Sequence, residues 1–136
     1  LVGGNARRQV VLDVVQNVLD GGIELVLRHL ALGSGRLLDL LEKYKGDAEA
    51  ALRGETSPWC LYAFSPLREN LFEWLEIGKR DRVLQVGSDY GSCTGLFAER
   101  AGEVVVLDPL DEDLEVNRKR HGEKENLRIT KYWYPV

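Results

Sequence analysis

The chain has 136 residues, of which 44% are hydrophobic and 29% are charged, and its formal net charge is −4 at pH 7. This length favours one compact domain, or one domain with a helical extension, over two full domains. The apolar share excludes a disordered chain, and no apolar run reaches the roughly 18 residues that a membrane helix needs. The acidic balance disfavours sequence-independent binding to nucleic acid. We therefore expect a soluble protein without a membrane segment or a nucleic-acid partner.

The two cysteines, Cys60 and Cys93, are too few for a disulfide framework and lack metal-ligand spacing. We expect buried, reduced thiols in a cytoplasmic protein and no metal site. Cys93 lies near a predicted helix start, where the pKa of a thiol can fall, so a nucleophilic role is the alternative. The first residues lack the basic and apolar regions of a secretory signal. No methionine occurs, even at position 1, which suggests a piece of a longer protein.

The N-terminal region, residues 1–76, is predicted to be helical from residue 5 to about residue 75. Apolar residues recur there at helical spacing. Asn5 and Asp47 are candidate caps, Gly46 ends one helix, and Ser65-Pro66 starts the last one. We expect the apolar stripes to pack in the core. They comprise Val11, Val14, Val15 and Val18, residues 23–32, Leu37, Leu38, Leu41 and Tyr44, and finally Leu67, Leu71, Trp74 and Leu75.

Residues 77–136 have a different pattern, in which short apolar runs alternate with longer mixed segments. The runs at 83–86, 104–107 and 127–130 are typical of buried strands, and the segments at 94–101 and 114–121 are typical of helices closed by glycine. This alternation predicts an α/β protein with right-handed crossovers and a parallel sheet. The basic end of the second helix, residues 118–121, is predicted to be a solvated face.

The turn after the predicted strand at 83–86 indicates what kind of ligand the protein binds. Gly87 and Gly91 permit positive φ and the close approach of a ligand, and the helix behind them presents backbone N–H groups to an anion. Asp108 ends the next strand, 21 positions after Gly87. The carboxyl ends of neighbouring parallel strands line one crevice, where a carboxylate can accept hydrogen bonds from both ribose hydroxyls. The turn and the acid therefore predict a nucleoside-binding cleft.

Two common nucleotide-binding motifs fit this turn poorly. A dinucleotide fingerprint needs glycines at positions 87, 89 and 92, whereas this chain has Asp89 and Ser92 at the last two. A P-loop needs Gly-Lys-Ser or Gly-Lys-Thr, which is absent from the sequence. A nicotinamide or flavin dinucleotide domain remains an alternative, although Asp89 and Ser92 count against it.

Over about residues 60–131, the chain resembles the class I S-adenosylmethionine-dependent methyltransferases. The resemblance lies in the apolar strand with Gly87 and Gly91, and in residues 94–101 before the run that ends at Asp108. It implies a Rossmann-like sheet of which this chain supplies the first β-α-β-α-β, an incomplete methyltransferase fold with its cofactor-binding domain at residues 77–136. Residues 59–71 are also similar to a lead-in that precedes this motif in some bacterial methyltransferase domains.

The same resemblance implies S-adenosylmethionine as the cofactor. Gly87 and Gly91 would form the turn under its methionine end, and Asp108 would hold its ribose. The family usually has an acid at position 85 and a glycine at position 89, so Gln85 and Asp89 depart from its pattern. The full set of implied cofactor-binding residues is Gln85, Gly87, Ser88, Asp89, Tyr90, Gly91, Asp108 and Pro109.

No residue is assigned a catalytic role, because the family carries its catalytic motif on a fourth strand that the chain does not reach. The leading hypothesis is a methyltransferase, represented by its cofactor-binding portion, with an unidentified methyl acceptor. The alternative is a catalytically inactive methyltransferase-like module that acts in assembly or protein interaction. An unpaired strand at the edge of a short sheet favours a homo-oligomer or a missing C-terminal segment.

Overall fold

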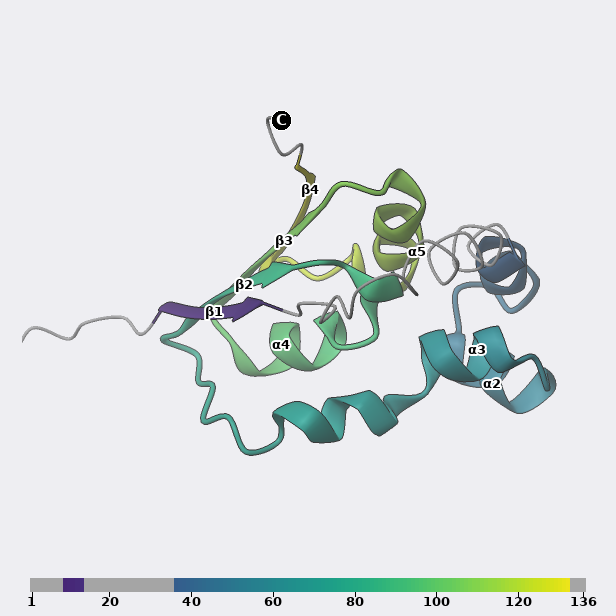
Figure 1. Cartoon of the computed structure of the whole chain (residues 1–136), viewed down its shortest axis with the longest axis horizontal. Helices are drawn as coiled ribbons and strands as arrows, with labels where there is room; N and C mark the ends of the chain where they lie inside the picture. Colours follow the sequence, from purple (N-terminus) through teal and green to yellow (C-terminus); the bar gives the residue numbers. More distant parts are fainter. Residues whose placement is uncertain (1–8, 14–35, 133–136) are drawn as a thin grey trace, which may run out of the picture.

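The computed structural model describes residues 9–13 and 36–132. These residues form a parallel sheet with the strand order β1-β2-β3-β4 (Figure 1). The strands are β1 (Gln9–Asp13), β2 (Arg82–Val86), β3 (Glu103–Asp108) and β4 (Leu127–Lys131). The predicted α/β class and parallel sheet are therefore confirmed, with one strand more than the sequence predicts.

The additional strand, β1, shows that the helix predicted around residue 11 is wrong. Val10 pairs with Val83 and Val11 with Leu84, so β1 extends the sheet on the side of β2 that β3 leaves free. Valine is stiff at χ1 and favours strands, and the free edge of β2 offers backbone donors and acceptors with which a strand can pair. The predictions made for Asn5, Val14, Val15 and Val18 and for residues 23–32 lie outside the described residues.

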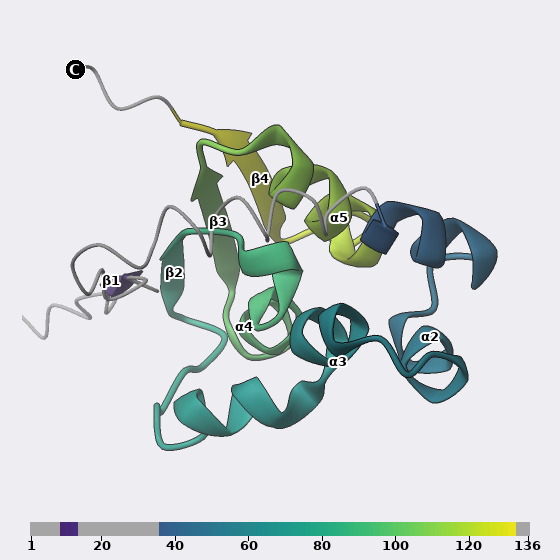
Figure 2. The same cartoon turned by 45° about the vertical axis from the view of Figure 1, so that its right-hand side comes forward.

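The strands β2, β3 and β4 are linked by α4 (Thr94–Arg100) and α5 (Asp111–His121). Both helices lie on the same side of the sheet (Figure 2). Val83, Val104 and Val106 point to this side and are at most 2% exposed. They pack with the fully buried Phe97 of α4. The burial of each such side chain contributes roughly 1.5–3 kcal/mol to the stability of the fold. This layer therefore stabilises the sheet and, with it, the positions of the strand ends.

A helical layer precedes β2 and consists of residues 36–43, α2 (Ala48–Gly54) and α3 (Pro58–Phe64). The predicted Asp47 cap is confirmed, since its carboxylate accepts a hydrogen bond of 2.8 Å from the Ala50 amide. Gly46 ends the first helical segment with φ +83°, as its position predicts. α3 lies in the region predicted to be helical, and its local signals are Ser57-Pro58 and the i, i+3, i+4 spacing of the buried Cys60, Ala63 and Phe64. The core of this layer comprises Leu37, Leu41, Ala51, Cys60, Ala63 and Phe64, joined by Tyr90 and Val116.

The segment before β2 is a 3-10 helix, η1 (Pro66–Phe72), rather than an α-helix. Its predicted start is confirmed, because the Ser65 hydroxyl accepts a hydrogen bond of 3.3 Å from the Leu67 amide. Its predicted core face is wrong, since Leu67 and Trp74 are 69% and 77% exposed. A 3-10 helix has three residues per turn, so the inner position falls to Phe72, whose ring meets Phe97 edge to face at 5.2 Å.

Within residues 9–13 and 36–132, no helix is both long enough and apolar enough to cross a membrane.

Candidate functional site

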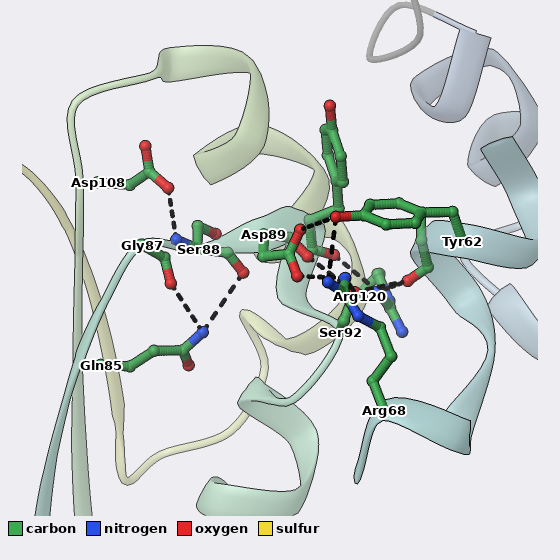
Figure 3. Close-up of polar contacts among 11 residues, drawn as sticks. Tyr62, Arg68, Gln85, Gly87, Ser88, Asp89, Ser92, Asp108 and Arg120 are labelled. Atoms are coloured by element: carbon green, nitrogen blue, oxygen red, sulfur yellow. Dashed lines mark hydrogen bonds and ion pairs between the residues drawn. The ribbon is translucent and has the colours of Figure 1, made fainter. Parts of the chain in front are cut away.

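The turn after β2 and the acid at the end of β3 are in direct contact (Figure 3). The sheet register pairs Val86 with Leu107, and the Gly87 amide continues the ladder with a hydrogen bond of 2.8 Å to the Leu107 carbonyl. The Ser88 amide then donates to one oxygen of the Asp108 carboxylate. The two halves of the predicted cleft are therefore adjacent parts of one structure.

The Asp108 carboxylate also accepts a hydrogen bond of 2.8 Å from the Leu110 amide, on its other oxygen. The residue is only 4% exposed, and this burial raises its pKa, although both backbone hydrogen bonds lower it. An ionised carboxylate has about four acceptor positions, and these two hydrogen bonds use one on each oxygen. Pro109 follows directly and is half-buried.

The backbone of the turn lies largely in the left-handed region. Gly87 and Gly91 have φ of +89° and +75°, and the intervening Asp89 and Tyr90 have +45° and +56°. Asp is one of the residues that tolerate this region, but for a bulky residue such as Tyr90 it is a true outlier. Such backbone conformations persist only when the surrounding structure stabilises them. The contacts described next provide this stabilisation.

Gln85 supports the turn from inside the protein instead of facing the cleft. Its side chain is fully buried, and its amide nitrogen donates to the carbonyls of Gly87 at 3.0 Å and Ser88 at 3.4 Å. Its amide oxygen accepts a hydrogen bond of 2.9 Å from the Thr94 hydroxyl. An acid at position 85 could not make the two donor contacts in its ionised form, so the departure from the family pattern has a structural role here.

Asn117 of α5 completes this buried network. Its amide nitrogen donates to the hydroxyls of Ser88 at 2.8 Å and Thr94 at 2.9 Å, and all three residues are fully buried. The hydroxyl of Ser88 is thus used internally, and only its amide reaches Asp108. The role of Asn117 is not predicted from the sequence, although a polar residue directly after Val116 and three positions after Leu114 on the same helix was the available signal.

Two glycines of the motif make room for α5. A Cβ atom on Gly91 would come within 2.7 Å of the Asn117 amide oxygen, and one on Gly95 within 2.9 Å of the His121 ring. His121 hydrogen-bonds the Gly91 carbonyl at 2.9 Å, and burial lowers its pKa to about 4. Close packing against α5 therefore accounts for the absent side chains of Gly91 and Gly95. The positive φ predicted for Gly91 is confirmed, and ligand approach at Gly91 stays a prediction.

The Asp89 side chain turns toward η1 and α3 (Figure 3). Its carboxylate forms an ion pair with Arg68 and accepts a hydrogen bond of 3.5 Å from the Tyr62 hydroxyl. Arg68 also donates to that hydroxyl at 3.0 Å and stacks on the Tyr62 ring at 4.3 Å. Burial raises the pKa of Asp89, and the Arg68 charge opposes this rise.

Arg120 joins α5, α3 and the turn. One guanidinium nitrogen donates to the carbonyls of Ala63 at 2.8 Å and Tyr90 at 2.7 Å, and the group lies over the Phe64 ring at 5.0 Å. Burial lowers its pKa to about 10. The prediction of a solvated basic face is therefore correct for the exposed Arg118 and Lys119 and wrong for Arg120 and His121.

Three other side chains near the turn are buried in the protein. Tyr90 is 3% exposed and inserts into the core of the helical layer, which anchors the turn there. Cys93 is 6% exposed, and burial raises its pKa to about 11, which supports the inert alternative over the nucleophilic one. Cys60 is fully buried in the helical layer, as expected.

Comparison with known proteins adds no family to this geometry: no protein-family model matches the chain, and neither does any curated protein. Among the described residues, no group of three or more His, Cys, Asp or Glu side chains is placed to hold a metal ion. The site therefore has to be interpreted from its own residues: a left-handed turn, a nearly buried carboxylate beside it, and a partly exposed charge pair.

Proposed function

We propose that the chain is the cofactor-binding portion of an S-adenosylmethionine-dependent methyltransferase, with a Rossmann-like sheet. The observation that supports this most directly is the Ser88–Asp108 hydrogen bond, because it joins a glycine turn and an acid at the carboxyl ends of neighbouring parallel strands. That edge of a parallel sheet is where α/β proteins bind nucleotides. The methyl acceptor is not part of the proposal.

The residues around the turn fit a nucleoside of this kind in their hydrogen-bonding chemistry. Asp108 would accept the ribose hydroxyls on its two remaining acceptor positions, and Gly87 and Gly91 would support the amino-acid end. When bound, S-adenosylmethionine supplies a sulfonium methyl group for transfer to a nucleophile. What this chain contributes is a turn that Gln85 and Asn117 hold from inside, and a carboxylate that the Ser88 and Leu110 amides hold beside it.

We place this function in the cytoplasm, where thiols stay reduced. The supporting observation is that Cys60 and Cys93, the two cysteines of the sequence, are both free.

A second candidate function is a catalytically inactive module that takes part in assembly. The exposed apolar side chains of Leu67, Leu71 and Trp74 favour it, since large exposed apolar patches often mark interaction sites. The sheet order also ends at β4, whose outer edge no described strand covers. We propose self-association or a C-terminal partner segment at such surfaces, and light scattering showing a monomer at all concentrations would contradict self-association.

Thermal unfolding with added nucleosides separates these functions. S-adenosylhomocysteine at 100 times its Kd should stabilise the protein by about 2.7 kcal/mol, which corresponds to a rise of several degrees in Tm. Asp108→Asn should abolish the rise. Asp111→Asn, the same change at the exposed start of α5, should preserve it.

Two results would count against the methyltransferase. No rise in Tm at millimolar S-adenosylhomocysteine would favour the inactive module. A rise with NAD and none with S-adenosylhomocysteine would favour a dinucleotide domain.

A further inference from the structure

Tyr90 connects the turn after β2 to the helical layer. Its side chain is 3% exposed and packs in the core of that layer, which includes Leu37 and Leu41. Its backbone φ of +56° is a left-handed conformation, which is unfavourable for a bulky residue. Such a conformation persists only where the surrounding structure stabilises it, so the packing of the helical layer holds the backbone of the turn at this position.

The carbonyl of Ala63, in the last turn of α3, is a second connection between the helical layer and the turn. It accepts hydrogen bonds from the Ser92 hydroxyl at 3.0 Å and from the Arg120 guanidinium at 2.8 Å (Figure 3). The same nitrogen of Arg120 donates to the Tyr90 carbonyl at 2.7 Å. The helical layer is therefore linked to the backbone of the turn as well as to the Tyr90 ring.

The residues on either side of Tyr90 lead directly to the proposed binding group. Ser88, two positions earlier, donates its amide hydrogen to the Asp108 carboxylate. The Ser88 carbonyl accepts a hydrogen bond of 2.8 Å from the amide of Gly91, the residue after Tyr90. This hydrogen bond spans Tyr90 and depends on its left-handed backbone, and the position of the Ser88 amide beside Asp108 depends on the same backbone.

We propose that Tyr90 is a positioning residue through which the packing of the helical layer controls ligand binding beside Asp108. The inference rests on the proposed function, because it takes S-adenosylhomocysteine as a ligand of the turn. A change in the packing of residues 36–64 is then transmitted to the site without any contact with the ligand. Coupling between two sites is reciprocal, so a ligand that fixes the turn also stabilises the helical layer.

The test is a cycle of variants in which the affinity for S-adenosylhomocysteine is measured by calorimetry. Leu41→Ala loosens the core of the helical layer, where Leu41 is 1% exposed. Tyr90→Gly removes the ring and permits the left-handed backbone without steric cost. The double variant completes the cycle. Val104→Ala is the matched control, because Val104 is fully buried in the other core, beside Phe97 and away from the Tyr90 ring.

We expect Leu41→Ala to weaken the binding of S-adenosylhomocysteine by about 5-fold or more, the lower end of typical coupling between sites. Val104→Ala should leave the affinity unchanged. In the Tyr90→Gly background, Leu41→Ala should have no further effect, because the helical layer no longer holds the turn. A loss of affinity that reflected only lower stability would also occur in Val104→Ala and would persist in the Tyr90→Gly background.

Amide hydrogen exchange measures the coupling in the opposite direction. The Ala51 and Leu61 amides donate to backbone carbonyls within the helical layer. At matched saturation with S-adenosylhomocysteine, their exchange should slow in the wild type and much less in Tyr90→Gly. Equal slowing in the two proteins contradicts the inference, because Tyr90 would then transmit nothing.

The remaining outcomes separate the inference from the proposed function. If S-adenosylhomocysteine binds the wild type and Leu41→Ala leaves its affinity unchanged, or weakens it equally in both backgrounds, the inference fails and the proposed function stands. If it does not bind the wild type, the proposed function fails, and exchange of the Ser88 amide in the free protein decides the inference. Leu41→Ala should then speed this exchange by about 5-fold or more relative to Val104→Ala, and equal rates contradict the coupling. Should Leu41→Ala fail to fold, Leu41→Val makes a smaller cavity at the same position and takes its place.

Discussion

The backbone amide of Ser88 donates a hydrogen bond to the carboxylate of Asp108, and this single contact joins the turn after β2 to the end of β3. The second oxygen of Asp108 is held by the Leu110 amide at 2.8 Å, which fixes the start of α5 as well. Any ligand that uses Asp108 therefore binds to a group that also supports the fold. Stability and binding consequently have to be measured separately for every variant in this region.

Gln85→Glu tests whether the residue braces the turn. The introduced carboxylate, when ionised, would place a buried charge against the Gly87 and Ser88 carbonyls, where Gln85 now donates two hydrogen bonds. We expect a loss of roughly 1–3 kcal/mol or more in unfolding free energy at pH 7, measured by urea denaturation. Because a buried glutamate has a raised pKa, the loss should shrink as the pH falls. A stability equal to wild type at pH 7 would show that the donor contacts are unimportant.

Gly95→Ala tests whether the glycine makes room for His121. The added Cβ would lie 2.9 Å from the His121 ring, so we expect destabilisation of about 1–3 kcal/mol despite the better helix propensity of Ala. In a His121→Ala background the steric conflict is gone, and the same change should be neutral or stabilising by up to about 1 kcal/mol. Chemical denaturation of the four proteins gives this cycle. Equal effects in both backgrounds would assign the glycine to another cause.

Asp113 predicts a pH dependence of stability. Burial, with the charges of Asp108, Asp89 and Glu112, raises its pKa to about 7 in the folded protein, above about 3.9 in an unfolded chain. The folded state therefore holds this proton more tightly, and its contribution to stability is greatest below pH 4 and is lost as the pH rises through 7. Asp113→Asn should remove this contribution, so its stability relative to wild type should increase from pH 4 to pH 8. Urea denaturation at a series of pH values checks the difference, and a constant difference would exclude the raised pKa.

Two aromatic substitutions test which side of η1 and the residues after it faces the core. Trp74 is 77% exposed, whereas Phe97 is fully buried against Phe72. We expect Trp74→Gln to change the unfolding free energy by less than about 0.5 kcal/mol, and Phe97→Ala to lower it by about 3–5 kcal/mol. Light scattering of Trp74→Gln also shows whether the exposed face contributes to self-association. A large loss of stability from Trp74→Gln would show that this face packs in the core, as the sequence predicts.

Local patterns in the sequence determined the elements that carry the site. The apolar runs of β2, β3 and β4 and the glycines that close α4 and α5 act through near neighbours along the chain, so their positions are predicted correctly. Caps such as Asp47 and Ser65 are equally local. The place of Asp108 beside the glycine turn follows as well, because parallel strands bring their carboxyl ends to one edge.

Tertiary structure decided which polar groups meet around that turn. Arg120 reaches a carbonyl 57 positions away, and Asn117 reaches a hydroxyl 29 positions away, so no periodicity within either segment encodes the contact. Residues 9–13 form a strand by pairing with the free edge of β2. Leu67 and Leu71 are exposed in η1, which is wound as a 3-10 helix. Residue type and spacing determine local conformation, whereas the pairing of distant charges and donors depends on how the finished elements pack.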